Sequence, residues 1–303
     1  INLMTEVQRT WAYLESIFIG SEDIRKQLPE DTKRFDKIDI EVRKILVNAE
    51  KIPNVVNFCV QDELETTLES IQEQLAMCEN KLAAYLEEKK KSFPRFYFVS
   101  VVDLLDILST GGQSPKNIMR HYSKLFQAVD KVEFEPNGYT ATAVISREGE
   151  RLKFKEPIDL VGKVEDYLQK LLDAIKEALR FILSDAVVTY SEDDQRDRWL
   201  FKYIAQIVLV TCQIYWTQEV NKAFESLEEN NENAMKDYNQ KQIQQLNALI
   251  EKVQHNLEPG DRQKIMNVIT IDVHARDIVE KLVKDKVGSA SSFAWQSQLR
   301  QRW

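Results

Sequence analysis

The chain contains 303 residues, with 8 Gly, 7 Pro and a formal net charge of −8. Its apolar content of 43% is enough for packed cores and excludes a chain that is disordered throughout, and the scarcity of Gly and Pro favours helices. The negative charge disfavours binding to nucleic acid or other acidic polymers. The lack of a signal peptide, or of an apolar run of roughly 18 residues, predicts a soluble, intracellular protein without a membrane span.

The first helices are predicted over residues 2–19, 31–49 and 61–91, from apolar residues spaced three or four positions apart. The third helix has the most regular pattern, with apolar residues at Leu64, Leu68, Ile71, Leu75, Cys78, Leu82 and Tyr85. This seven-residue repeat is typical of a coiled coil, but it extends over only three heptads. We therefore interpret the segment as one helix of a bundle, with a coiled coil as the alternative.

An aromatic stretch at 92–98, with a proline at its centre, interrupts the helical pattern. Two shorter helices are predicted after it, over 99–108 and 115–126. The second is expected to begin with Ser114 as its N-cap and Pro115 at the first helical position.

Residues 131–156 differ in character and predict a small β-meander. Three short runs alternate apolar residues with charged or β-branched ones, and the turn sequences Asn137-Gly138 and Glu148-Gly149 separate them. Because about 25 residues cannot form an independent core, we expect this sheet to be an insert.

Longer helices are predicted in the second half of the chain, over 164–190, 191–227, 243–257 and 261–286. The acidic string at 191–194 is expected to open the second of these, because negative charge is favourable at the start of a helix. Asp261 is expected to cap the last one.

These elements predict a mainly α protein, an elongated rod of consecutive antiparallel helical bundles with one small inserted β-meander or hairpin. Residues 1–130 are expected to form an N-terminal bundle, 131–156 the insert, 157–288 a bundle of long helices, and 289–303 an aromatic segment. Since the chain starts without methionine and stops on that aromatic segment, we expect it to be a piece of a longer protein.

No cysteine pattern indicates a metal or redox site. Cys59, Cys78 and Cys212 lie far apart, match no zinc spacing and are expected to be small core residues in a reducing compartment. Acidic runs such as 228–232 lack the turn geometry of a calcium loop.

The sequence also lacks a pattern typical of catalysis. His121, His255 and His274 are each predicted on a helix without a neighbouring nucleophile, so structural hydrogen bonds, for His274 with Asp277, are the simpler expectation. Residues 111–116 imitate a phosphate-binding loop but lack its second glycine. We expect no catalytic, cofactor-binding or metal-binding residue in this segment.

Several strings of residues occur in a fixed order along almost the whole chain. They are Trp-Ala-Tyr-Leu-Glu-Ser-Ile-Phe at 11–18, Ser-Glu-Asp-Ile at 21–24, Ser-Phe-Pro-Arg-Phe-Tyr-Phe at 92–98 with Asp-Leu-Leu at 103–105, Arg-Glu-Gly-Glu at 147–150, Gln-Ile-Tyr-Trp at 213–216 and Phe-Ala-Trp-Gln-Ser-Gln-Leu-Arg at 293–300. Together they resemble the linker region of dynein heavy chains, which precedes the first AAA+ module. Residues 269–279 and the string at 296–300 look like axonemal rather than cytoplasmic heavy chains, and suggest an outer-arm, beta-like class.

The resemblance implies a non-catalytic lever that bends and straightens across the AAA+ ring of a microtubule-motor ATPase and so drives ciliary or flagellar beating. ATP and Mg²⁺ would bind in the ring, and this segment would hold no cofactor. The implied partners are the ring of the same heavy chain, other dynein heavy, intermediate and light chains, and microtubules. The implied location is the cytoplasm and cytoskeleton, in the axoneme of a cilium or flagellum. No nucleic acid or membrane is expected as a partner.

Phe96, Tyr97, Trp295, Arg300 and Trp303 are the candidates for docking on the ring. Aromatic and arginine side chains supply most of the binding energy of protein interfaces. The alternative for each aromatic residue is a place in the linker's own core.

Bending is expected where few contacts cross, at 111–114, 156–162 or 230–233, and we favour 156–162 because it separates halves of different character. A passive helical scaffold or tethering rod is the main alternative function, and it would show a repeat of constant length, which the sequence lacks. An uncharacterised helical enzyme would need a cluster of titratable residues. Within the family, the alternative is a cytoplasmic-type dynein linker.

Overall fold

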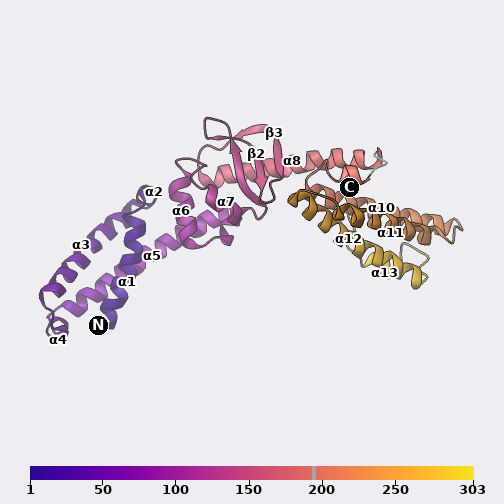
Figure 1. Ribbon diagram of the computed structural model, residues 1–303. Helices are drawn as coiled ribbons and strands as arrows, with labels where there is room; N and C mark the ends of the chain where they lie inside the picture. Colours follow the sequence, from indigo (N-terminus) through magenta and orange to yellow (C-terminus); the bar gives the residue numbers. More distant parts are fainter. Residues whose placement is uncertain (193–195) are drawn as a thin grey trace. The chain divides into compact units, whose positions relative to one another are not determined.

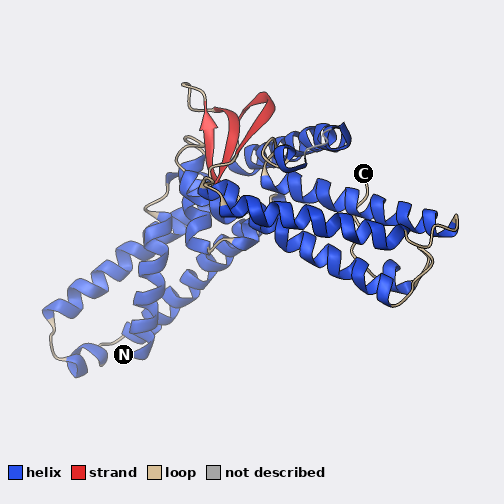
Figure 2. Cartoon of the chain, turned by 45° about the vertical axis from the view of Figure 1, so that its right-hand side comes forward, coloured by secondary structure: helices blue, strands red, loops and turns tan. Residues whose placement is uncertain are grey.

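The computed structural model describes residues 1–192 and 196–303, which form two compact units (Figure 1). Unit 1 contains Ile1–Ala141 and Ile158–Leu172, and unit 2 contains Thr142–Pro157 and Asp173–Trp303. Helices account for most of the described residues, and the single sheet found among them is drawn in red in Figure 2. The prediction of a mainly α fold with a small β insert is confirmed.

Unit 1 contains the helices of the first half of the chain. They are α1 (Asn2–Phe18), α2 (Glu22–Gln27), α3 (Pro29–Lys51), α4 (Val55–Cys59), α5 (Leu64–Ser92), the 3-10 helix η1 (Pro94–Phe98), α6 (Val101–Gly111), α7 (Met119–Leu125) and the first residues of α8 (Val164–Glu192). The four helices predicted between residues 2 and 108 correspond to α1, α3, α5 and α6, with ends that differ by a few residues.

Helices α1, α3 and α5 pack on one another around a shared core. The seven-residue pattern of α5 forms its buried face, through Leu68, Ile71, Leu75, Cys78 and Leu82. In the same bundle, the rings of Phe18 of α1 and Phe35 of α3 stack with their centroids 5.3 Å apart. The interpretation of α5 as one helix of a bundle is therefore confirmed.

The sheet contains β1 (Val129–Phe134), β2 (Thr140–Ser146) and β3 (Arg151–Asp159), in the order β1-β2-β3. Gly138 (φ 80°) and Gly149 (φ 85°) adopt the left-handed conformation that the two tight turns require. The register is set beside these turns, where Glu135 N–H donates to Thr140 O and Ser146 N–H donates to Glu150 O. The predicted meander is confirmed.

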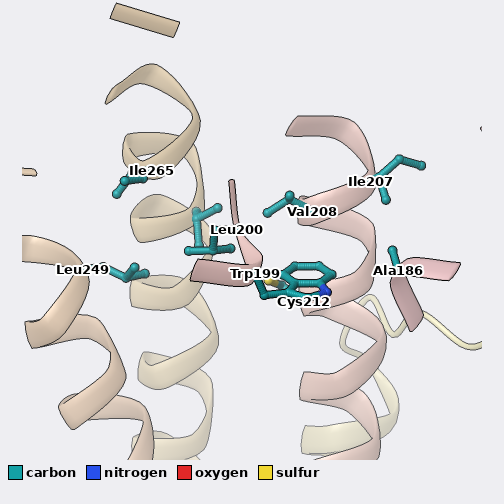
Figure 3. Close-up of a cluster of buried hydrophobic side chains, with 9 residues drawn as sticks. Ala186, Trp199, Leu200, Ile207, Val208, Cys212, Leu249 and Ile265 are labelled. Carbon is teal, nitrogen blue, oxygen red and sulfur yellow. The ribbon is translucent and has the colours of Figure 1, made fainter. Parts of the chain in front are cut away.

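Unit 2 is built from the rest of α8, α9 (Arg196–Trp199), α10 (Ala205–Glu228), α11 (Ala234–Gln254), α12 (Pro259–Lys284) and α13 (Phe293–Gln296). Helices α10, α11 and α12 pack together. One part of their core surrounds Trp199 and Leu200, which are completely buried together with Val208 and Ile265 (Figure 3). A second part surrounds Trp295.

The helix predicted over 191–227 is wrong in its first part. Helix α8 continues to Glu192, α9 is a separate short helix, and α10 begins only at Ala205. Burial explains the break, because the short α9 places Trp199 in the core, where its Nε1 donates to Thr189 Oγ1 over 3.2 Å. Asp193 and Asp194, part of the string expected to open this helix, lie outside the described residues.

Two predicted caps are also wrong. Helix α7 begins at Met119 rather than Pro115, and Ser114 Oγ instead accepts a hydrogen bond from Lys116 N–H within the preceding turn. Helix α12 begins at Pro259, so Asp261 lies inside its first turn and pairs with Lys264.

The cysteine prediction holds for two of the three residues. Cys78 and Cys212 are buried, whereas Cys59, at the end of α4, is exposed. Among the helices of the described residues, none combines the length and the apolarity that crossing a membrane would need.

Candidate functional site

The aromatic stretch between α5 and α6 has an inner and an outer side. Pro94 opens η1, and in a 3-10 helix residues three apart share a face. Phe93 and Phe96 therefore point inward together, are 1% and 0% exposed, and contact each other edge to face at 5.0 Å. Tyr97 and Phe98 follow on the outer side and are 52% and 78% exposed.

The start of α6 extends this outer side. Val101 and Val102 are its first two residues and are 39% and 70% exposed. Ser100 fixes their position as the N-cap, because its Oγ accepts from Asp103 N–H and donates to Asp103 Oδ2 over 2.9 Å. We call Tyr97, Phe98, Val101 and Val102 the η1–α6 surface. A group of large apolar side chains exposed on neighbouring positions is typical of an interaction site.

Two side chains of α5, Glu87 and Lys90, contact Tyr97. Its hydroxyl donates to Glu87 Oε1 over 2.6 Å, and Lys90 Nζ lies 5.6 Å from the centre of its ring. The hydrogen bond to Glu87 raises the pKa of Tyr97, so the side chain remains a neutral donor at physiological pH. One aromatic side chain of the surface is thus oriented before any partner arrives.

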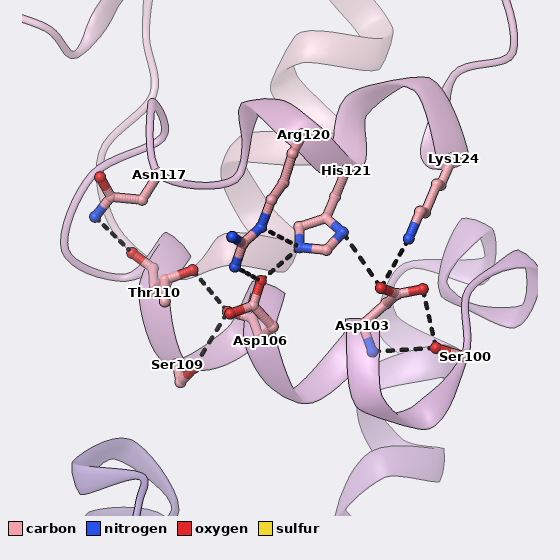
Figure 4. Close-up of polar contacts among 9 residues, drawn as sticks. All are labelled: Ser100, Asp103, Asp106, Ser109, Thr110, Asn117, Arg120, His121 and Lys124. Carbon is pink, nitrogen blue, oxygen red and sulfur yellow. Dashed lines mark hydrogen bonds and ion pairs between the residues drawn. The ribbon is translucent and has the colours of Figure 1, made fainter.

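A polar groove of about 390 Å³ lies beside Val102. Asp103 and Asp106 face it from α6, three positions apart, and Arg120, His121 and Lys124 face it from α7 (Figure 4). Each carboxylate is paired. Lys124 Nζ lies 2.8 Å from Asp103 Oδ1, and Asp106 Oδ2 lies 2.5 Å from both Arg120 Nη2 and His121 Nε2.

The charges of this groove lower the pKa of both carboxyl groups. For Asp103 the causes are the hydrogen bonds from Lys124 and Ser100. For Asp106 burial acts in the opposite direction, but the hydrogen bonds from Arg120 and His121 outweigh it. Both groups are therefore ionised at neutral pH, and the groove is an ion-pair network that fixes α7 against α6.

His121 takes the structural role expected of it, as it is 4% exposed and bonded to Asp106. His274 is exposed, and the expected partner, Asp277, binds Arg276 instead. His255 lies just past the end of α11 rather than within it. Within residues 1–192 and 196–303, no group of three or more His, Cys, Asp or Glu is placed to hold a metal ion.

The C-terminal aromatic segment behaves differently from η1. Trp295 is completely buried, and its indole contacts Trp216 edge to face at 5.1 Å. Its Nε1 donates to Asn221 Oδ1 over 2.9 Å, and both of these partners lie on α10. Trp216 of the string at 213–216 thus packs against Trp295 of the string at 293–300.

The other aromatic and basic residues of this segment lie outside the core. Arg300 covers the ring of Trp295 at 5.8 Å and bonds Gln296, while Gln301 N–H donates to Thr217 Oγ1. Trp303 is 60% exposed. Of the five predicted docking residues, Phe96 and Trp295 therefore fill the cores of their own units, while Tyr97 and Trp303 are open to a partner.

The string at 147–150 also has a packing role within unit 2. Glu150, in the β2–β3 turn, accepts the backbone N–H of Ala205 with both carboxylate oxygens, at 2.9 and 3.0 Å. It thereby caps α10, whose own N-cap, Ile204, has no side-chain acceptor. Lys264 Nζ, on α12, lies 3.1 Å from the same carboxylate and donates to Tyr203 O.

Sequence reasoning missed Phe98, Val101 and Val102. Phe98 belongs to the string at 92–98, but the helical periodicity that separates inner from outer residues does not apply to a 3-10 helix. Val101 and Val102 lie within the helix predicted over 99–108, which in the structure starts two residues later, at Val101.

Comparisons with known proteins agree with the resemblance to dynein heavy chains that the sequence strings indicated. The family model of the dynein heavy chain, N-terminal region 2, matches residues 1–186. A ciliary dynein beta chain of Tripneustes gratilla is 51% identical over all of this chain, and dynein axonemal heavy chain 17 of Homo sapiens is 49% identical over the same extent. The beta chain of the flagellar outer arm of Chlamydomonas reinhardtii is 44% identical over 97% of it.

The chain spans only 6–7% of the length of these three relatives, which are named as ciliary, axonemal or flagellar proteins. Three of the strings that suggested the resemblance have a visible place in the structure. The string at 147–150 caps α10, the string at 293–300 packs on α10, and the string at 92–98 leaves Phe98 exposed. The chain therefore belongs to the dynein heavy chain family, and most of it corresponds to that family's N-terminal region 2.

Proposed function

We propose that this chain is the linker of an axonemal dynein heavy chain, a non-catalytic lever that moves across the AAA+ ring and transmits force to microtubules. The observation that carries the proposal is the match of residues 1–186 to the dynein heavy chain N-terminal region, together with axonemal relatives about half identical over the whole chain. The heavy chain would act in the axoneme of a cilium or flagellum, with ATP and Mg²⁺ bound in its ring.

The η1–α6 surface is the docking site that we assign to this lever. A two-state element moves from 1:99 to 99:1 when docking favours one state by about 5.5 kcal/mol. Three well-buried interface side chains, at about 2 kcal/mol each, reach that value. Phe98 and Val102, being 78% and 70% exposed, have the most apolar area left to bury.

Packed cores favour movement of whole units over bending within them. The chain passes between the two units after Ala141, Pro157 and Leu172, which lie inside β2, β3 and α8. Bending at 156–162 stays a prediction from the sequence.

The test uses the complete heavy chain with Phe98→Ala and Val102→Ala. We expect microtubule gliding to slow several-fold while basal ATP turnover changes little, because the ring's chemistry is intact and only the transmission is weakened. Phe181→Ala, which removes another exposed phenylalanine (62%) from α8, is the control and should leave both rates unchanged. Equal loss of gliding and ATP turnover in the double variant would contradict the proposal.

A passive scaffold is the remaining alternative. The described helices contain no repeated unit, and each of the aromatic strings occurs once. A scaffold also predicts that the double variant glides at the normal speed, so the same assay separates the two functions.

A further inference from the structure

Unit 2 contains a narrow polar cavity of about 20 Å³ in the packed region of α10, α11 and α12. Trp216 lines it from α10, Gln242 from α11 and Asp272 from α12, and Arg196 of α9 reaches it as well. Polar side chains in such a position normally satisfy one another, because an unpaired polar group away from water is unfavourable.

Three buried atoms on this cavity have no hydrogen-bond partner among the residues that the structure describes. They are Arg196 Nε, Trp216 Nε1 and Gln242 Oε1. The side chains of Trp216 and Gln242 are well buried, with 7% and 9% of each residue exposed. Two of the three atoms are N–H donors and one is a carbonyl acceptor.

The charged groups around the cavity are already paired with other residues. Asp272 receives both terminal nitrogens of Arg196, over 2.8 and 3.0 Å, and Glu219 binds Lys241 over 2.7 Å and also the hydroxyl of Tyr238. Arg196 Nη2 additionally contacts the Sγ of Cys212. Since none of the described residues bonds the three remaining atoms, we look for their partner outside the chain.

The volume of the cavity and the polarity of its lining limit which molecule can bind there. About 10–15 Å³ of accessible space holds one water molecule, so 20 Å³ excludes any organic ligand. An anion would meet the carbonyl oxygen of Gln242 and the carboxylates of Glu219 and Asp272, while a cation would meet the two N–H groups. A water molecule accepts from both N–H groups and donates to the carbonyl at the same time.

We propose that one water molecule is a permanent part of unit 2 and joins Trp216 of α10, Gln242 of α11 and Arg196 of α9, which is paired with Asp272 of α12. The same water molecule would fix the indole of Trp216, and the ring of Trp295 packs edge to face against that indole. The water site thereby belongs to the anchor of the C-terminal segment, a role independent of the proposed lever function.

The direct test is a crystal structure of the 303-residue chain at a resolution that shows ordered water. We expect a single density peak within hydrogen-bonding distance of at least two of the three atoms. An empty cavity, a coordinated ion, or a direct protein partner for Trp216 Nε1 would each overturn the proposal.

A stability measurement tests it independently. Gln242→Met removes the acceptor and keeps the side-chain volume, and Gln244→Met, on the exposed side of the same helix, is the matched control. If water is bound, Gln242→Met loses one of its bonds and lowers the melting temperature by several degrees relative to Gln244→Met. If the cavity is dry, the change removes an unsatisfied buried oxygen, and the melting temperature stays level or rises, which contradicts the proposal.

Discussion

The two aromatic segments of this chain, at 92–98 in unit 1 and at 293–303 in unit 2, have similar compositions but different roles. Both contain aromatic residues, at least one arginine and a short helix. The first buries Phe93 and Phe96 and presents Tyr97 and Phe98 to the outside. The second buries a single residue, Trp295, against α10. Aromatic content alone therefore does not distinguish exposed rings from buried ones, and the element that each ring packs against does.

The largest difference in unfolding free energy is expected at Trp295, the buried residue of the second segment. Trp295→Ala should destabilise unit 2 by about 3–5 kcal/mol, because it empties a packed site and leaves Asn221 without its donor. Phe293→Ala, two positions away, should change the unfolding free energy by less than about 0.5 kcal/mol, because Phe293 is 83% exposed. Urea unfolding of the two variants measures both values. Similar losses for the two would show that Trp295 is not an anchor.

A smaller contrast is expected within the first segment. Phe96→Leu should cost about 1 kcal/mol, because the core can partly accommodate the new shape. Phe98→Leu should be nearly neutral for folding, since its ring is largely in water. The midpoint of chemical unfolding gives the comparison. The division into an inner and an outer side would be refuted if Phe98→Leu were the more destabilising of the two.

The smallest effect concerns the ion-pair network next to the η1–α6 surface. The pKa values of Asp103 and Asp106 are lowered in the folded state, so their contribution is present above the unfolded pKa of about 4 and is lost as the pH falls through the folded values. Since both side chains are partly exposed, at 23% and 27%, the total is expected to stay at about 1 kcal/mol or less.

Asp106→Asn tests this network. It removes one of the two titrating groups, so the variant should lose less stability than the wild type between pH 6 and pH 3, as followed by thermal unfolding across that range. Asp173→Asn is the control, because Asp173 belongs to unit 2 and its carboxylate is mostly exposed. An unchanged pH profile for Asp106→Asn would contradict the assigned pKa shift.

The sequence predicted the parts of the fold in which neighbouring residues decide the structure. The seven-residue pattern of α5 and the turn sequences of the meander each specify a local geometry, and both predictions are confirmed. The failures involve distant partners. Trp199 ends up in the core through α9, and the cap of α10 comes from Glu150, 55 residues earlier in the chain.

The candidate site was predictable only as a segment. The string at 92–98 indicated a functional region, but its period of three residues exposes Phe98 rather than Phe96. The string at 293–300 gave no sign that Trp295 pairs with Asn221, which is 74 residues away. Helical spacing describes which residues share a face, but it does not identify the element that covers that face.

Hydroxyl-radical footprinting of the complete heavy chain, compared with the 303-residue chain, tests the docking role of the η1–α6 surface most directly. We expect Tyr97 and Phe98 to be oxidised readily in the isolated chain and to be protected in the heavy chain in at least one nucleotide state. Trp295 should be protected in both. Equal oxidation of Phe98 in the two samples, in every nucleotide state, would contradict the docking role.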